Sequence, residues 1–567
     1  MDLDAIRRAL LSLGSVQKAV VSTSAVDSID LDVNLANHRR IVQIRLSIPA
    51  KFPVDLPTVV LLDTEPLHLA HVNYAGTVCV IEDGGLSCDL DQPAAVAVWW
   101  LTRTVDVLEA SYAQAASGEF STLLTEFAGY WLPIGKHTVE LIAAPAGEPR
   151  IVTGYSRSGK LHAVDVTGPR IDKHHPARFR LTQLDKESVA YLPLIKPVLP
   201  PVRGATVGAR FIASAIKAQP PTHRRKLNGT LRRMPRKHRY RHYLLSQRAP
   251  NDTLNVVGLS IKAKRQAPDP VLEPSGAQGA AIPWNVSHHY RSYQLPRGGA
   301  LSDVGHKSVA IVGCGALGGA LARLLVQSGV GKLHLIDPDI YSIDNVYRHA
   351  LPSRFVGTLK TEALRYELTN LFPGVQITSM SQSLANIEEA LFAKSFDVIC
   401  LATGNPNVER DLVRRRLADP STPALVSGWI EPVSLGGHII TSRHGQPGCL
   451  ECNFHTATGA SHPGSRVSFL ADGQSVQQTL MGCAGSFTPY TATDAMQSAV
   501  LMARVVQDLL VNSPGPFYQF WRGNRHQADA NSVKISHWYS TSNAVDPQGA
   551  ANGLLNSSCS ECGSWHP

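Results

Sequence analysis

Four of the nine cysteines form two Cys-x-x-Cys pairs in the C-terminal part of the chain. The first pair is Cys449 and Cys452, and the second, Cys559 and Cys562, follows about a hundred residues later. Two such pairs have the usual spacing of a closed tetrahedral zinc site, in which all four ligands are thiolates. The spacing therefore predicts a structural Zn²⁺ site with no open coordination position.

A glycine-rich turn follows the apolar run Ser308–Val312 and leads directly into a predicted helix. Glycines in such a turn let a phosphate approach the backbone N–H groups at the helix N-terminus. The next predicted strand, Lys332–Ile336, ends in Asp337, where an acid can hold ribose hydroxyls. The pattern predicts a Rossmann-like nucleotide site. Its glycines are Gly313, Gly315 and Gly318.

The residues after this turn decide between two kinds of nucleotide enzyme. The turn alone also fits a dehydrogenase, but Asp339, Arg348 and Lys360 follow it. Adenylation makes a carboxylate attack the α-phosphate of ATP and expel pyrophosphate. Two anions must approach each other, so cations and Mg²⁺ are needed to neutralise the developing charge. A hydride-transfer site has no such need. Arg348 and Lys360 suit the chemistry of adenylation, the alternative is ordinary surface charge, and the choice of adenylation rests on the family resemblance given below.

Three further cysteines lie in this half of the chain. Cys314 sits inside the glycine-rich turn and Cys400 in an apolar run, which suits a buried thiol. Cys483 follows a glycine and precedes a predicted helix that begins near Ala492. A thiol ahead of a helix N-terminus has a lowered pKa and can act as a nucleophile. Cys483 is therefore the candidate nucleophile; the alternative is a small residue packed at a helix start.

These residues need three regions to position them. Residues 1–132 predict an α+β unit: a helix over residues 3–13, strands at residues 29–35, 41–48 and 58–62, and a helix over residues 94–116. Residues 133–300 predict a small middle module and a linker, the linker being the Pro-, Gly- and Ala-rich segment at residues 267–283. Residues 301–567 predict an α/β domain with a parallel sheet.

The second half of the chain resembles the ThiF/MoeB and ubiquitin-activating adenylation superfamily. The resemblance rests on Asp337-Pro-Asp339, on Asn345-x-x-Arg348 and on Lys360 in a Val-Gly-x-x-Lys turn. It implies that these residues bind ATP and Mg²⁺, and paired Cys-x-x-Cys motifs occur in many members. Gly404 stands where the family often has a further Asp. Either Asp337 and Asp339 suffice to hold Mg²⁺, or the site differs in detail.

Residues 1–132 resemble ubiquitin-conjugating enzymes. The run from His71 to Val80 is similar to their His-Pro-Asn…Gly-x-x-Cys signature, with Val72 in place of the proline. The resemblance implies that Cys79 accepts an acyl group by thioester exchange. Asn73 would offer its amide N–H₂ to the oxyanion formed when a lysine attacks.

An activating and a conjugating domain in this order resemble the fused ubiquitin-transferase-like enzymes of bacterial anti-phage (CBASS) systems. This resemblance implies a homodimer, and a protein substrate with a free C-terminal carboxylate, the tail of a cGAS/DncV-like nucleotidyltransferase. The tail would pass from the adenylate to Cys483, then to Cys79, then to a target lysine. A rival interpretation is a ThiF-type sulfur-carrier adenylating enzyme with a non-catalytic N-terminal binding domain.

The net charge of +9 is local in origin. Nine Lys or Arg residues and no acid lie between His223 and His242, and the rest of the chain carries 45 basic and 45 acidic residues. Such a run predicts a solvated loop or a docking surface for an acidic partner, and the alternative is a nucleic-acid-binding protein. The N-terminus lacks a secretory pattern and no apolar run reaches about 20 residues, so we expect a cytoplasmic protein that uses no membrane.

Overall fold

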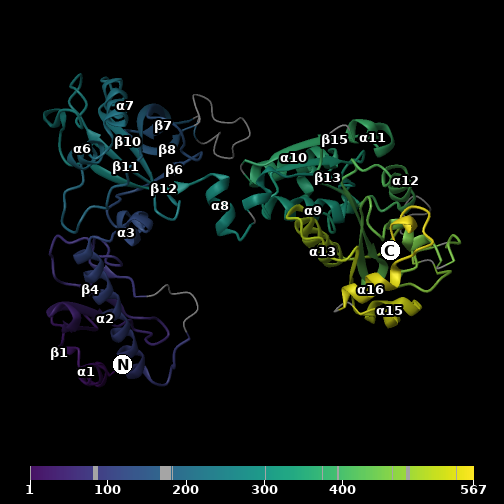
Figure 1. Ribbon diagram of the computed structural model, residues 1–567, viewed down its shortest axis with the longest axis horizontal. Coiled ribbons are helices and arrows are strands. Elements are labelled where there is room, and N and C mark those ends of the chain that lie inside the picture. Colours follow the sequence, from purple (N-terminus) through teal and green to yellow (C-terminus); the bar gives the residue numbers. More distant parts are fainter. Residues whose placement is uncertain are drawn as a thin grey trace. The chain divides into compact units, whose positions relative to one another are not determined.

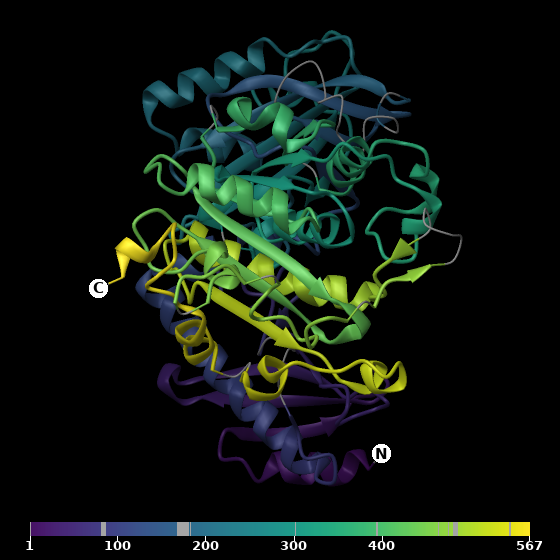
Figure 2. The same cartoon turned by 90° about the vertical axis from the view of Figure 1, so that its right-hand side faces the viewer.

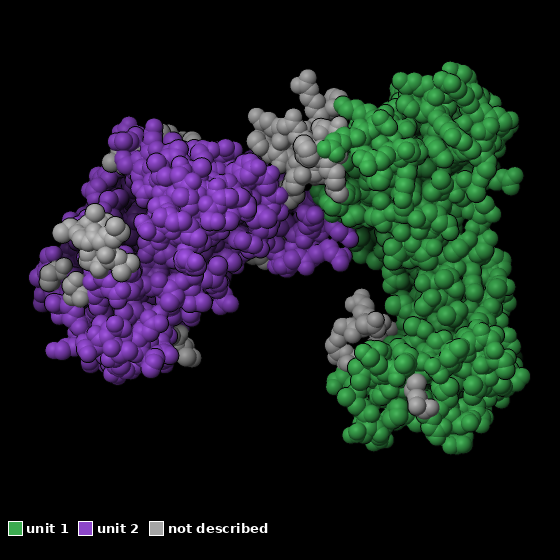
Figure 3. All heavy atoms as spheres, turned by 180° about the vertical axis from the view of Figure 1, so that it is seen from behind, with its two compact units in different colours: residues 1–171, 179–289 green, residues 172–178, 290–567 purple. Residues whose placement is uncertain are grey.

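The computed structural model divides into two compact units (Figure 3), and Figure 1 labels the helices and strands. Unit 1 comprises residues 1–171 and 179–289, and unit 2 contains residues 290–567. The structure describes all residues except Met1, 81–86, 167–180, 182, 301, 373, 393–394, 457, 463, 475, 480–485, 544–545 and Pro567.

The first part of unit 1 is an antiparallel sheet of five strands in the order β1-β2-β3-β4-β5, with α1 packed against α2. Alternate residues of β2 and β3 are apolar and buried, as expected for a sheet with one face on a core. The helices and strands predicted for residues 3–116 are confirmed. The elements are α1 (Leu3–Leu11), β1 (Val16–Val21), β2 (Ser28–Leu35), β3 (Arg40–Ser47), β4 (Thr58–Leu61), β5 (Thr77–Val78), α2 (Pro93–Ser117), α3 (Ser121–Thr125) and α4 (Phe127–Trp131).

The second part of unit 1 is a closed barrel of seven strands in the order β10-β11-β12-β6-β8-β7-β9. Apolar side chains of β9, β10 and β11 form one core with α6, α7 and Trp131. The elements are β6 (Thr138–Leu141), β7 (Arg150–Arg157), β8 (Lys160–Asp165), β9 (Asp185–Leu194), α6 (Ala209–Lys217), α7 (Pro221–Arg232), β10 (Tyr240–Arg248), β11 (Leu254–Lys262) and β12 (Ile282–His288).

Two segments of the barrel differ from the interpretation of their composition. The basic run is not a loop, because it forms α7 and the start of β10, and Arg241 is buried with its guanidinium bonded to backbone carbonyls. The segment at residues 267–283 is not a free linker. Asp269 is buried, accepts hydrogen bonds from the Tyr243 hydroxyl and the Val271 N–H, and burial raises its pKa to about 6.

Unit 2 is built on a seven-stranded sheet in the order β15-β14-β13-β16-β17-β18-β21. Several of its strands are the green and yellow arrows in Figure 2. The first five strands are parallel, as predicted, and β18 and β21 pair antiparallel at one edge. All residues of β13 and β16 are buried, which explains their continuous apolar runs. The strands are β13 (Ser308–Val312), β14 (Lys332–Ile336), β15 (Gln376–Met380), β16 (Val398–Leu401), β17 (Ala424–Glu431), β18 (Gly436–Ser442) and β21 (Tyr518–Arg522).

Helices pack against this sheet, and α13 lies against α9. A separate ribbon pairs β19 (Gln478–Thr479) with β20 (Ser486–Phe487). No described helix has the length and apolar character that crossing a bilayer requires. The helices of unit 2 are α8 (Arg291–Arg297), α9 (Ala316–Gln327), α10 (Lys360–Leu371), α11 (Leu384–Phe392), α12 (Pro406–Arg416), α13 (Ala492–Leu510), α14 (His526–Ala530), α15 (His537–Thr541) and α16 (Pro547–Leu554).

Candidate functional sites

The glycine-rich turn joins β13 to α9, and its glycines have different reasons to be glycine. A Cβ on Gly313, whose φ is +90°, would lie 2.3 Å from the Ala402 carbonyl oxygen, and one on Gly318 would lie 1.8 Å from the Gly313 oxygen. Packing within the protein therefore requires both. Gly315 has a negative φ, and a Cβ there would meet no described atom within 4 Å. The space over Gly315, at the start of α9, suits a phosphate group.

The two acids after β14, Asp337 and Asp339, differ in their burial and in their hydrogen-bond partners. Asp337 is buried, and its carboxylate accepts from the Cys314 N–H at 2.6 Å and from the Asp339 N–H at 2.8 Å. It therefore holds the glycine-rich turn against the end of β14. Asp339 is largely exposed and accepts from the Lys360 ammonium at 2.7 Å. Asp339 and the mostly buried Lys360 thus form a charged pair beside the turn, in which Asp339 is the exposed partner.

A further group of motif residues lies between β14 and α10, close to the glycine-rich turn. The Arg348 guanidinium lies over the Tyr490 ring, 5.3 Å from its centroid. His349, to which the sequence assigned no role, donates from Nε2 to the Cys314 carbonyl at 2.7 Å, and burial lowers its pKa. Asn345 uses its side-chain oxygen to accept from the Ser342 N–H and hydroxyl. Asn345 therefore caps the 3₁₀ turn η4 (Ile343–Asn345).

Gly404, which stands where the family often has an Asp, follows β16 and so lies at the carboxyl end of a parallel strand, as the glycine-rich turn does. Gly404 follows Thr403 in a turn and has a φ of +69°. Glycine has no side chain, so this position offers no carboxylate. The nearby Glu409 carboxylate is buried and accepts from the Thr403 N–H at 2.9 Å and hydroxyl at 2.7 Å. Burial raises the pKa of Glu409. Glu409 therefore shapes this turn, and Asp339 is the accessible acid among those described here.

The four cysteines of the paired motifs come together, as their spacing predicts. Cys449, Cys452, Cys559 and Cys562 are buried, and their sulfurs all lie within 4.8 Å of one another. The Cys449–Cys559 and Cys452–Cys562 sulfurs are 3.7 and 3.4 Å apart. A tetrahedral zinc with bonds of about 2.3 Å has sulfur–sulfur edges of about 3.8 Å, whereas a disulfide is about 2.05 Å long. The cluster fits a closed zinc site.

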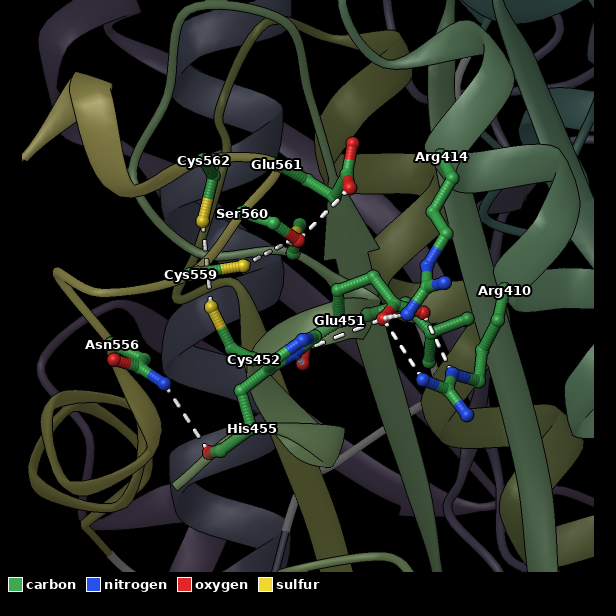
Figure 4. Close-up of polar contacts among 12 residues, drawn as sticks. Arg410, Arg414, Glu451, Cys452, His455, Asn556, Cys559, Ser560, Glu561 and Cys562 are labelled. Carbon is green, nitrogen blue, oxygen red and sulfur yellow. Dashed lines mark hydrogen bonds and ion pairs between the residues drawn. The ribbon is translucent and has the colours of Figure 1, made fainter. Parts of the chain in front are cut away.

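A buried carboxylate ties this cluster to α12 (Figure 4). Glu451, between the first two cysteines, is fully buried and accepts from Arg410 at 2.7 and 3.0 Å and from Arg414 at 2.6 Å. Its carboxylate raises the pKa of Arg414. Both arginines belong to α12, which starts directly after the Thr403 turn. The pairing compensates a charge that would be costly if buried alone.

Replacing Cys562 by serine is expected to abolish stoichiometric zinc binding, measured by atomic emission on the purified protein. The free energy of metal binding contributes directly to the stability of the fold, so the loss of one ligand should lower the free energy of unfolding by several kcal/mol. At about 2–4 °C per kcal/mol for a domain of this size, the melting temperature should fall by roughly 10 °C. The control Cys88→Ser alters a half-buried thiol outside the cluster and should leave both values unchanged. Full zinc content in Cys562→Ser would contradict the assignment.

The conjugating-like loop presents Cys79 directly after β5. Cys79 is exposed, and its N–H donates to the His71 carbonyl at 2.8 Å. The Asn73 side-chain oxygen accepts from the Ala75 and Thr77 N–H groups at 2.9 and 3.0 Å. No described acceptor takes the Asn73 N–H₂ group, so it can serve an oxyanion. Sequence reasoning missed Tyr130, whose hydroxyl accepts from the His71 N–H at 2.6 Å.

The remaining cysteines separate by burial. Cys314 and Cys400 are completely buried, and burial raises the pKa of both thiols far above the usual value. Neither can supply a thiolate at neutral pH. Cys483, the predicted nucleophile of this half, lies outside the described residues. Its role therefore stays a prediction.

Residues 289–535 match the ThiF family, and residues 17–137 match Prokaryotic E2 family B. The ATP-dependent ubiquitin transferase-like protein Cap2 of Pseudomonas aeruginosa is 28% identical over 206 residues, 36% of either chain. Molybdopterin-synthase adenylyltransferase of Escherichia coli is 35% identical over 147 residues, 25% of this chain and 57% of that protein. A solved structure of E. coli MccB with ATP is 17% identical, covering 41% of this chain and 64% of its own at a TM-score of 0.31.

The alignments therefore span little more than a third of the first relative and just over half of the second. Within this chain, a ThiF-type domain follows a prokaryotic E2-type domain. This confirms the predicted fold class and the predicted fusion of an activating-type with a conjugating-type domain.

Proposed function

From the union of a ThiF-type and a prokaryotic E2-type domain in one chain, we propose an ATP-dependent, ubiquitin-transferase-like enzyme that conjugates a protein. The observation that carries this proposal is that both halves hold a site of the required chemistry. The ThiF-type half has an open turn at Gly315 beside Asp339 and Lys360. The conjugating half has the exposed Cys79 close in sequence to an Asn73 amide with no described acceptor.

The first step joins the substrate to AMP. A carboxylate oxygen at the C-terminus of the substrate protein attacks the α-phosphorus, and the bond to the leaving pyrophosphate breaks. The N–H groups at the start of α9 receive the phosphates, and Lys360 and Arg348 stabilise the charge that develops. Mg²⁺ bound with ATP would neutralise phosphate charge, and the exposed Asp339 would hold it, while the buried Asp337 fixes the turn beside it.

The later steps pass the acyl group to an amine. The Cys483 thiolate attacks the acyl carbon and AMP leaves, after which the Cys79 thiolate takes the acyl group by thioester exchange. A target lysine amine then attacks the Cys79 thioester, the carbon–sulfur bond breaks, and the amine loses a proton to water. The Asn73 N–H₂ group would donate to the oxyanion of this last step.

The printed name of the Pseudomonas relative supports an ATP-dependent, ubiquitin transferase-like activity, and the sequence resemblance suggests a substrate class. We infer that the carboxylate belongs to the tail of a cGAS/DncV-like nucleotidyltransferase and that the conjugation primes it in CBASS anti-phage defence. We also infer a homodimer built on the ThiF-type domains.

Exchange of labelled pyrophosphate into ATP tests the adenylation step. We expect exchange with a cGAS/DncV-like nucleotidyltransferase from the same genome. The same protein with its C-terminal carboxylate converted to an amide should support none, because an amide oxygen carries no negative charge to attack phosphorus. Equal exchange with both forms would contradict the proposal, and exchange only with a sulfur-carrier protein would support the rival interpretation.

A further inference from the structure

The loop that carries Asn73 has little regular secondary structure, although backbone hydrogen bonds and the isolated bridge of Val72 with Val78 join its end to β5. Residues 62–76 connect β4 to β5 without helix or strand. On one side, two hydroxyl groups are among the groups of the conjugating-like domain that hold this loop. The Tyr130 oxygen accepts from the His71 N–H at 2.6 Å, and the Ser111 hydroxyl donates to the Ala70 carbonyl at 2.6 Å. The Leu62 N–H also donates to the Gln43 carbonyl, and the Gln43 N–H donates to the Asp63 carboxylate. Further contacts reach the loop from outside this domain.

Those contacts come from the barrel part of unit 1, from residues 198–205, which we call the strap. His68 Nε2 donates to the Pro200 carbonyl at 2.9 Å, and the Tyr74 hydroxyl donates to the Ala205 carbonyl at 2.9 Å. The strap is itself anchored to β10. The Gln247 amide accepts from the Val198 N–H at 3.0 Å and donates to the Val198 carbonyl at 2.9 Å. The loop is thus held on its second side by the barrel.

Arg203 makes the central contact of the strap. Its Nη1 donates to the Leu61 carbonyl at 2.6 Å and to the Asp63 carbonyl at 3.0 Å, at the point where β4 ends and the loop begins. A charged donor makes stronger hydrogen bonds than a neutral one. Asp63 and Arg203 also line a small cavity that Asn73 and Tyr130 border. The guanidinium therefore lies at the base of the loop, next to its catalytic end.

Gly76 shows how closely the guanidinium approaches the motif. Gly76 has a φ of +87°, and a Cβ there would lie 2.6 Å from Arg203 Nη1. The Arg203 side chain thus occupies the place of a side chain three residues before Cys79. The Gly76 carbonyl accepts from the Leu61 N–H at 2.8 Å, and the Gly76 N–H donates to the Asn73 carbonyl at 2.8 Å. A short chain of bonds therefore connects Arg203 to Asn73.

We propose that Arg203 is a positioning residue for the conjugation step: from the barrel, it fixes the Leu61–Gly76 junction and so aims the Asn73 amide at the thioester on Cys79. This inference rests on the proposed function for the identity of that step. Arg203 touches neither amine nor thioester. Its effect must therefore pass through Asn73, and it concerns aminolysis of the loaded Cys79, not adenylation of the substrate.

The test loads Cys79 without ATP, in the full chain with Cys483→Ser. The probe is a fluorescent glycyl thioester of 2-mercaptoethanesulfonate, and its loss from Cys79 is timed with and without free L-lysine. We expect Arg203→Ala to slow lysine-dependent discharge about tenfold, because small misplacements of a catalytic group have effects of this size or larger. Arg203→Lys keeps one donor and should slow it about threefold. Hydrolysis without lysine should change less than twofold.

Two comparisons make the result specific. Arg248→Ala removes another arginine of the barrel that donates to a carbonyl, that of Asp252, and should leave discharge unchanged. In an Asn73→Ala background, Arg203→Ala should add less than a twofold effect, because two residues acting through one group are not additive. A full tenfold effect in that background, or wild-type discharge in Arg203→Ala, would overturn the inference. Chemical loading bypasses adenylation, so failure of the ATP-dependent relay would be recognised separately.

Discussion

In a Cys79→Ser variant, ATP-dependent transfer of the substrate to lysine is expected to fall by more than about 10³-fold, as when a covalent nucleophile is lost. The serine oxygen is a poorer leaving group than a thiolate, so any acyl group that reaches residue 79 should remain there as an oxyester. Intact mass spectrometry with ATP and substrate would detect it as a stable adduct. Pyrophosphate exchange should be unchanged, because the ThiF-type half performs that step.

The matched control is Cys88→Ser, a half-buried thiol in the same domain without motif support. It should transfer at the wild-type rate. If Cys79→Ser still transferred the substrate to amines, the two-cysteine relay would be wrong. The rival interpretation, a ThiF-type adenylating enzyme with an N-terminal domain used only for binding, would then be favoured.

Removing the Lys360 ammonium should have the largest effect on the first step. Lys360 is mostly buried, and its ammonium lies 2.7 Å from the exposed Asp339 carboxylate beside the glycine-rich turn. We expect Lys360→Met to lower pyrophosphate exchange by about 10²–10³-fold, the usual effect of removing one group that stabilises transition-state charge. The loss should appear in kcat, because this charge develops as pyrophosphate departs.

A second Lys–Asp pair of the same sheet provides the control. Lys307, at the opposite end of β13, contacts Asp397 at 2.9 Å. Lys307→Met should leave pyrophosphate exchange within twofold of the wild type. An equal loss in both variants would show that the pairs act on the stability of the sheet, and Lys360 would lose its assigned role.

Local patterns predicted most of the fold and sites because the chemistry there is local in sequence. The buried strand at residues 308–312, its glycine-rich turn and the following helix are one continuous segment, and each Cys-x-x-Cys pair fixes two ligands within four residues. The four cysteines predicted as zinc ligands therefore lie together in the structure. The sequence assigned Asp337 to ribose binding but did not predict that Asp337 is buried and bonded to the glycine-rich turn, because both features depend on tertiary packing.

The barrel could not be predicted from the sequence, and the reason is physical. Its strands close through parallel pairings of β9 with β10, of β12 with β6 and of β6 with β8, and no local turn signals such pairings. The basic run looked like a solvated loop because charged residues outnumber the apolar ones of α7 that face the core. The contact of Arg203 with Leu61 joins residues 142 positions apart, so no spacing rule could reveal it.

The metal cluster also constrains the order in which the protein can mature during synthesis. Cys449 and Cys559 are 110 positions apart, and α13 and β21 lie between them. During synthesis, the whole stretch between the two motifs must therefore be made before the second thiol pair exists. Metal capture with all four thiolates becomes possible only after the central sheet has its last strand. Zinc supply would thus govern a late step of biogenesis, and zinc-starved cells should accumulate chains with a formed sheet and an unsecured tail.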